Sequence, residues 1–279
     1  MFELLLLGLT FVCLLLASIE DFKTREIPDY LSYVFLSAAL LFRILWAVSD
    51  SNIMVLAWIP VSFGMLFTFS YLMYRAGQWG GGDVKLMAGL SIALSSFLTD
   101  GYIPYFINYF MNVLIAGSIY GIAMVLYMGF KNRKKIKLGL FDKVLIFSVA
   151  IVSTVTVYLL KSSPALMFLC LLTIISIGLL KYLKLIEKKC MEDYVPIKNV
   201  TEGDWLIKDV KVGNTVIKAR AIGLIQEDIK KLNALYKNGK LKRVLIKIGI
   251  PFIPAFFFAF LLSLMFGNVL LRIFSLAII

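Results

Sequence analysis

The chain has 279 residues, of which 61% are hydrophobic and 16% charged, and its formal net charge is +12. Soluble domains average about 45–50% apolar and about 25% charged residues, so this composition excludes an ordinary soluble domain and indicates a multi-spanning membrane protein. The sequence has no histidine, and its cysteines, Cys13, Cys170 and Cys190, are far apart. HExxH zinc chemistry and histidine-activated nucleophiles are therefore excluded. We expect no metal and no cofactor. Carboxylates are the first candidates for any hydrolysis; a Ser-Lys pair is the remaining option, but Lys161-Ser162-Ser163 falls in an expected outer loop of ordinary composition.

Eight apolar stretches approach the length of about 20 residues that a membrane-spanning helix needs. The expected spans are Phe2–Ile19, Tyr30–Val48, Ile53–Tyr74, Val84–Leu98, Ile103–Phe130, Val144–Leu160, Pro164–Leu183 and Ile248–Phe274. The first is expected to be a retained helix and not a cleaved signal peptide, because its basic residues, Lys23 and Arg25, follow the apolar run.

Basic residues are concentrated in alternate loops. The first loop carries Lys23 and Arg25, the third has Arg75 and Lys85 at its edges, and the fifth, residues 131–137, is strongly basic. Because Lys and Arg accumulate in short cytoplasmic loops, we expect the N-terminus outside, the odd-numbered loops in the cytoplasm, and the protein in the cell membrane. The anionic lipid leaflet accounts for the positive charge, so no nucleic-acid partner is expected.

Polar residues interrupt the apolar pattern from residue 184 to residue 247. Alternating β-branched residues around Gly213-Asn214 predict a β-hairpin, and the following segment, closed by Asn238-Gly239, predicts a short amphipathic helix. The expected fold is an all-α polytopic membrane protein with about eight transmembrane helices and a small α+β cytoplasmic insert before the last helix. The expected domains are a helical membrane domain 1–183, the insert 184–247, and a final transmembrane helix 248–279.

Residues 77–90 read GQWGGGDVKLMAGL, with three glycines and Asp83 before an apolar run. Helix capping by Asp83 is the simpler interpretation. A second acidic group, Glu20, Asp21, Glu26 and Asp29, follows the first span and is expected on the same membrane face. Carboxylates at membrane depth are candidates for function, and two that lie close together share a proton and activate water. The glycines Gly80, Gly81 and Gly82 would then permit close backbone approach.

These segments resemble two motifs of the type IV prepilin peptidases, which are membrane aspartic proteases. Gly80 to Asp83 fit the G-x-G-D pattern, and residues 21–29, DFKTREIPD, fit D-x-x-x-R-x-I-P-[N/D]. The similarity is greatest to the archaeal prepilin and preflagellin peptidases and covers the first five spans and the last. The extra pair of spans, residues 144–183, departs from the simplest six-span arrangement.

The resemblance implies that Asp21 and Asp83 are the catalytic pair and that Gly80 and Gly82 shape the site. Arg25, Ile27 and Pro28 would hold the loop after the first span, although Arg25 is equally well explained as a positive-inside anchor. Lys85 beside Asp83 could tune it, or serve as a membrane-edge charge. The implied partners are the lipid bilayer and prepilin or preflagellin precursors, whose short basic leader would be cut at the cytoplasmic face. The four-cysteine zinc domain of some bacterial relatives is missing, so no methyltransferase activity is expected.

Two other interpretations fit part of the pattern. A presenilin-like intramembrane protease shares G-x-G-D and a later Pro-Ala-Leu, which residues 164–166 match. An ion-coupled transporter could use the same two aspartates, although such folds usually contain internal repeats, which we do not find. The sequence leaves open the choice between pilin-like and flagellin-like substrates and the oligomeric state.

Overall fold

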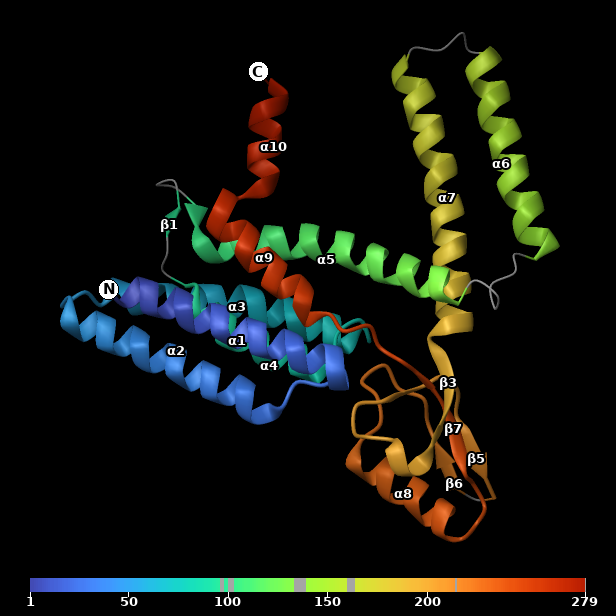
Figure 1. Ribbon diagram of the computed structural model, residues 1–279, viewed down its shortest axis with the longest axis horizontal. Helices are drawn as coiled ribbons and strands as arrows, with labels where there is room; N and C mark the ends of the chain where they lie inside the picture. Colours follow the sequence, from blue (N-terminus) through green and yellow to red (C-terminus); the bar gives the residue numbers. More distant parts are fainter. Residues whose placement is uncertain (96–97, 100–102, 133–138, 160–163, 214, 279) are drawn as a thin grey trace. The chain divides into compact units, whose positions relative to one another are not determined.

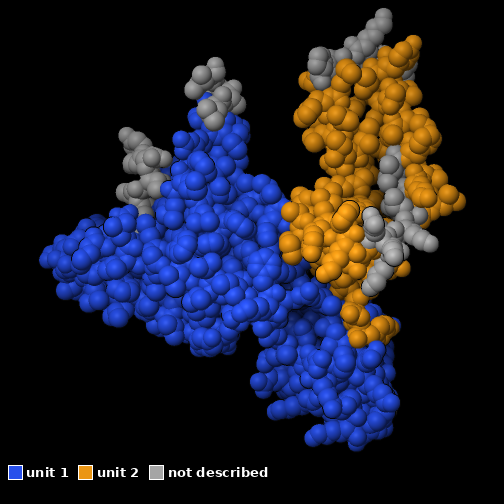
Figure 2. Space-filling view, in the orientation of Figure 1, with its two compact units in different colours: residues 1–121, 195–279 blue, residues 122–194 orange. Residues whose placement is uncertain are grey.

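The computed structural model describes residues 1–95, 98–99, 103–132, 139–159, 164–213 and 215–278. The chain divides into two compact units, coloured differently in Figure 2. The first comprises residues 1–121 and 195–279, and the second comprises residues 122–194. The first unit contains both predicted aspartates.

Helices form most of the first unit (Figure 1). In chain order they are α1 (Phe2–Thr24), α2 (Asp29–Ser49), α3 (Met54–Arg75), α4 (Gly81–Ala93), the start of α5 (Tyr105–Lys131), α9 (Ile253–Phe266) and α10 (Val269–Ile278). Two short strands, β1 (Leu98–Thr99) and β2 (Ile103–Pro104), pair antiparallel between α4 and α5. Helix α4 packs against α1, α2 and α3, while α9 packs against α1.

The turn between α1 and α2 is set by its local sequence. Arg25 adopts the left-handed conformation with φ 59°, and its N–H donates to the carbonyl of Asp21 at 2.9 Å, which ends α1. Pro28 precedes α2 with φ −59°, and proline fixes this angle without requiring an N–H partner. Asp21 therefore lies in the last turn of α1, immediately before a tight connection.

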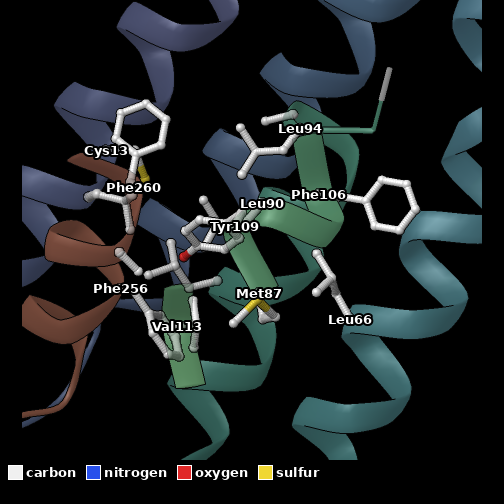
Figure 3. Packing of buried hydrophobic residues seen from close by; sticks show 14 of the residues in the cluster. Cys13, Leu66, Met87, Leu90, Leu94, Phe106, Tyr109, Val113, Phe256 and Phe260 are labelled. Carbon is white, nitrogen blue, oxygen red and sulfur yellow. The ribbon is translucent and has the colours of Figure 1, made fainter. Parts of the chain in front are cut away.

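The core of the helical bundle is formed by apolar side chains of six helices, α1 to α5 and α9. Figure 3 shows residues from α1, α3, α5 and α9 around α4, among them Cys13, Leu66, Met87, Leu90, Phe106, Tyr109, Phe256 and Phe260. Lipid tails are as apolar as these side chains, so close packing, more than removal from water, holds such a core together. Helix α4 is the most enclosed element, since all its residues from Val84 to Ala93 except Lys85 are buried.

The predicted count of eight spans is not confirmed. Among the described residues, five helices are long and apolar enough to cross a membrane: α1, α2, α3, α5 and α7 (Pro164–Cys190). Helices α9 and α10 would make a sixth span, bent by 46°. Helix α4, expected as the span Val84–Leu98, has only 13 residues, and α6 (Leu140–Leu159) contributes a shorter apolar stretch. The chain is thus a multi-pass membrane protein, with five or six full-length spans among the residues that the structure describes.

The second unit consists mainly of α6 and α7, which pack against each other, together with the end of α5. Gly129 lies close to α7, because a Cβ atom at this position would be 2.6 Å from Ile186 Cδ1. The basic loop 133–138, which supported the predicted topology, lies outside the described residues.

Within the expected insert 184–247, residues 184–190 belong to α7, and residues 195–247, called the insert from here on, form a small α+β structure with its own hydrophobic cluster. It contains a 3₁₀ turn (Ile197–Asn199), β4 (Trp205–Leu206), β5 (Val210–Val212), β6 (Thr215–Ile217), α8 (Gln226–Lys237) and β7 (Arg243–Lys247), and β3 (Glu192–Pro196) leads into it. Strand β7 lies between β3 and β4. The predicted hairpin is confirmed by the antiparallel pairing of β5 with β6, although Asn214 lies outside the described residues. The predicted amphipathic helix is α8.

Candidate active site

Asp21 lies where α1 meets the beginning of α9. Its side chain is only 6% exposed, and its Oδ2 accepts the N–H of Ile253, the first residue of α9, at 2.8 Å. The first N–H groups of a helix have no partner within the helix, and a carboxylate there also interacts favourably with the helix dipole. Asp21 is therefore fixed by a main-chain group that is 232 residues away in the sequence.

Asp83 lies in the first turn of α4. Its Oδ2 accepts the N–H of Gly80 at 2.7 Å, so Asp83 does contribute to the helix start, as the simpler interpretation of the sequence expected. Gly82 approaches the loop after α1, because a Cβ atom there would lie 3.1 Å from Ile27 Cβ. Near Gly81, in contrast, the closest side-chain atom belongs to Tyr74 at 4.0 Å. Of the three glycines, Gly82 is thus the one whose missing side chain allows the two loops to meet.

Aromatic rings connect the glycine turn to α9. Trp79, 7% exposed, lies with its ring centroid 5.7 Å from that of Phe252 and 5.1 Å from that of Phe256. Phe252 directly precedes the residue that binds Asp21. This layer, together with the approach of Gly82 to Ile27, brings the start of α4 to the same end of the bundle as the last turn of α1.

The remaining residues singled out from the sequence surround this pair. Arg25 is exposed and ends α1, while Pro28 precedes α2. Lys85 forms an ion pair with Asp29 and lies 5.6 Å from the ring centre of Tyr33. Lys85 therefore links α4 to α2, and its ammonium is engaged by a carboxylate other than Asp83.

The insert contacts the loops that lead to both aspartates. The hydroxyl of Thr201 donates to Glu26 Oε1 at 2.7 Å, and the Thr201 N–H donates to Asp204 at 2.8 Å. Burial raises the pKa of Asp204, and the neighbouring Glu26 adds to this rise, while hydrogen bonds from Thr201 oppose it. On the other loop, a Cβ atom at Gly77 would lie 3.0 Å from the carbonyl oxygen of Ala221. No local pattern in the sequence predicted these contacts.

Two further features were missed by sequence reasoning. The N–H of Ile253 carries no side-chain signal, so its bond to Asp21 had no precursor in the sequence. Arg43 is fully buried in α2 and donates to the end of α4. The sequence does contain a feature that could have identified Arg43, because it is the one charged residue of the predicted span Tyr30–Val48. Ionisable residues within spans usually have a specific role.

The apolar helices define the class of this molecule as a multi-pass membrane protein, and two carboxylates, Asp21 and Asp83, each accept a main-chain N–H within its helical bundle. Residues 8–126 match the model of the "Type IV leader peptidase family". This match confirms the resemblance to type IV leader peptidases that the two motifs indicated.

Similar proteins carry corresponding names. The chain is 21% identical to "Prepilin peptidase EppA" of Methanothermobacter thermautotrophicus, in an alignment that covers 98% of this chain and 97% of that protein. It is 31% identical to "Preflagellin peptidase" of Methanococcus voltae over 43% of this chain and 54% of that protein. It is 34% identical to "Preflagellin peptidase" of Methanococcus maripaludis over 30% of this chain and 36% of that protein. No significant match to a solved structure was found.

Proposed function

We propose that this leader peptidase is an aspartic endopeptidase that uses Asp21 and Asp83 to remove the short basic leader of pilin-like or flagellin-like precursors. The observation that supports the proposal is the position of these carboxylates in the last turn of α1 and the first turn of α4, where Gly82 approaches Ile27, inside the segment that matches the family. The names of the relatives support this class of substrate.

The surroundings of the two carboxylates suit a shared proton. Among the described residues, neither Asp21 nor Asp83 forms an ion pair with Lys or Arg. Two neighbouring carboxylates without a cation between them do not both ionise freely, so one holds a proton while the other is charged. The charged carboxylate takes a proton from water, and the protonated one donates a hydrogen bond to the scissile carbonyl. Their main-chain partners, Ile253 and Gly80, fix the orientation of both groups.

The membrane face follows from the loop charges. Short basic loops favour the cytoplasmic side, and the loop after α1 and the turn before α4 are flanked by Lys23, Arg25 and Arg75. With the N-terminus outside, Asp21 and Asp83 lie at the cytoplasmic surface. A basic leader would remain in the cytoplasm while the apolar helix behind it enters the bilayer, and the cut between them would fall at the height of the two aspartates.

The test is cleavage of a precursor peptide by purified protein. The peptide carries a basic leader, a Gly at the cut site and an apolar helix, and the variants are Asp21→Asn and Asp83→Asn. Each variant is expected to lose cleavage by at least about 10³-fold, because each removes half of one catalytic unit. Glu20→Gln is the matched control: Glu20 is adjacent in sequence and makes only a 4.0 Å contact with Lys23, so its rate should stay within about threefold of the parent.

Two results would contradict the proposal. Parental rates in both Asn variants would exclude the aspartic mechanism. Failure of the folded parent to cleave any such precursor would instead favour the transporter interpretation, which uses the same carboxylates to couple ion movement.

A further inference from the structure

The C-terminal end of α4 is held by polar side chains of two neighbouring helices. Arg43 of α2, which has no exposed surface, donates from Nε to the carbonyl of Ile92 at 3.1 Å and from Nη2 to that of Ala93 at 2.7 Å. Ser62 of α3 donates to the carbonyl of Ser91 at 2.6 Å. Three successive carbonyls at the end of α4 thus accept hydrogen bonds from outside the helix.

These bonds compensate for the shortness of α4. At about 1.5 Å per residue, 13 residues extend about 20 Å, less than the hydrocarbon thickness of about 30 Å. The helix therefore ends among apolar side chains, where its last carbonyls would lack water. A guanidinium there supplies a forked pair of donors and a positive charge at the negative end of the helix dipole.

Arg43 also contacts an aromatic ring of its own helix. Its guanidinium carbon lies 5.3 Å from the ring centre of Trp46, one turn further along α2. The indole N–H of Trp46 in turn donates to Asp50 Oδ2 at 2.7 Å. Contacts within α2 therefore help to orient the Arg43 guanidinium. A guanidinium oriented in this way can hold the end of α4 in a defined position.

We propose that Arg43 is a positioning residue that fixes α4 along its axis and so sets where Asp83 lies relative to Asp21. Asp83 and Ala93 lie ten residues apart on the same helix, about 15 Å at helical rise, and a helix of this length moves as a rigid rod. At the other end, Gly82 meets Ile27, so a shift of α4 changes this contact together with the position of Asp83. The part of this inference that concerns catalysis rests on the proposed aspartic mechanism.

Disulfide formation between positions 27 and 82 measures the position of α4 without any reference to activity. Ile27→Cys and Gly82→Cys would place two Cβ atoms about 3.1 Å apart, about 0.4 Å closer than the lower end of disulfide geometry, so a small outward shift of the loop permits the bond. Cys13, Cys170 and Cys190 are first replaced by Ala or Ser. Cross-linking is measured under mild oxidation, on the folded fraction from size-exclusion chromatography. We expect at least threefold slower cross-linking with Arg43→Met than with Arg43.

Two further variants keep the test decisive if Arg43→Met folds poorly. Arg43→Lys retains a charge but presents one ammonium in place of a planar fork, so its cross-linking rate should lie between those of the parent and Arg43→Met. Ser62→Ala removes one of the three bonds and leaves the cation in place, so its rate should be near that of the parent. The expected order from fast to slow is parent, Ser62→Ala, Arg43→Lys, Arg43→Met.

Leader cleavage, with the native Ile27, Gly82 and cysteines, provides the functional readout. Per folded molecule, Arg43→Met should lower kcat at least tenfold and change KM less than twofold, because the displaced group acts in the chemical step, and Arg43→Lys should recover part of kcat. Equal cross-linking rates in the parent, Arg43→Lys and Arg43→Met would overturn the proposal, whatever the cleavage rates. Slower cross-linking with parental kcat would overturn its catalytic part. If Asp21→Asn and Asp83→Asn both cleaved at the parental rate, the proposed function would fail, but the predicted order of cross-linking rates would not change. The two failures can therefore be distinguished.

Discussion

Gly89 provides a direct test of the packing that places α4. It lies in the middle of this helix, where a Cβ atom would be 2.5 Å from Phe35 Cδ1 and 2.9 Å from Phe35 Cε1. Phe35 is 2% exposed, so its ring has little space into which it can move. Gly89→Ala should therefore push α2 and α4 apart or force Phe35 out of its rotamer.

The expected change in the free energy of unfolding of Gly89→Ala is the result of two opposing effects. Overpacking a closed core costs about 1–3 kcal/mol, while Gly→Ala inside a helix contributes about 1 kcal/mol of stability. Gly64→Ala in α3 isolates the second effect, since no atom lies within 4 Å of a Cβ at that position. Gly64→Ala should stabilise the protein by up to about 1 kcal/mol, and Gly89→Ala should be about 1–3 kcal/mol less stable than Gly64→Ala.

Both variants can be compared by unfolding the purified protein with SDS in mixed micelles and following tryptophan fluorescence. The same comparison should appear in activity, because α4 carries Asp83, and Gly89→Ala should cleave the leader more slowly than Gly64→Ala. Equal free energies of unfolding in the two variants would refute the reasoning, since they would mean that α2 and α4 are not in close contact at Gly89.

Two other substitutions test contacts around the site. Gly117→Ala would place a Cβ 2.8 Å from Phe252 Cζ, whereas a Cβ at Gly121 would have no atom within 4 Å. Because displacement of Phe252 should disturb the neighbouring hydrogen bond to Asp21, Gly117→Ala should cleave the leader at least about tenfold more slowly than Gly121→Ala. Equal cleavage rates in the two variants would argue against this explanation. Thr201→Val removes the donor to Glu26 and should lower the free energy of unfolding by about 0.5–1.5 kcal/mol. Glu26→Gln keeps an acceptor and should lower the free energy of unfolding less. A larger loss in Glu26→Gln than in Thr201→Val would contradict the assigned hydrogen bond.

Local sequence patterns were sufficient for most elements. The apolar runs beginning at Phe2, Tyr30 and Ile53 became α1, α2 and α3 with small changes at the ends, because each run is bounded by turn residues or charges. The hairpin of the insert was also predictable, since β-branched alternation around Gly213 is a local signal. The two aspartates were selected as candidates from residue type and loop charge, and their catalytic role stays a prediction.

Features that depend on partners distant in sequence could not be predicted. The expected single span Ile248–Phe274 is broken at Gly267-Asn268, where Asn112 of α5 donates to Ser263 and to the Gly267 carbonyl and accepts from the N–H of Val269. Hydropathy does not register such a break, since the residues on both sides are apolar. In the same way, the early end of α4 depends on donors from α2 and α3, and nothing in residues 84–98 alone specifies it.

The central claim is that Asp21 and Asp83 act as one unit, and a double-mutant comparison tests it most directly. Single-turnover cleavage rates would be measured for Asp21→Asn, Asp83→Asn and the double variant, with folding checked by size-exclusion chromatography. Groups that act together show strongly non-additive losses, so the double variant should be no more than about threefold slower than either single variant. Losses that multiply in the double variant, or a parental rate in either single variant, would contradict the account.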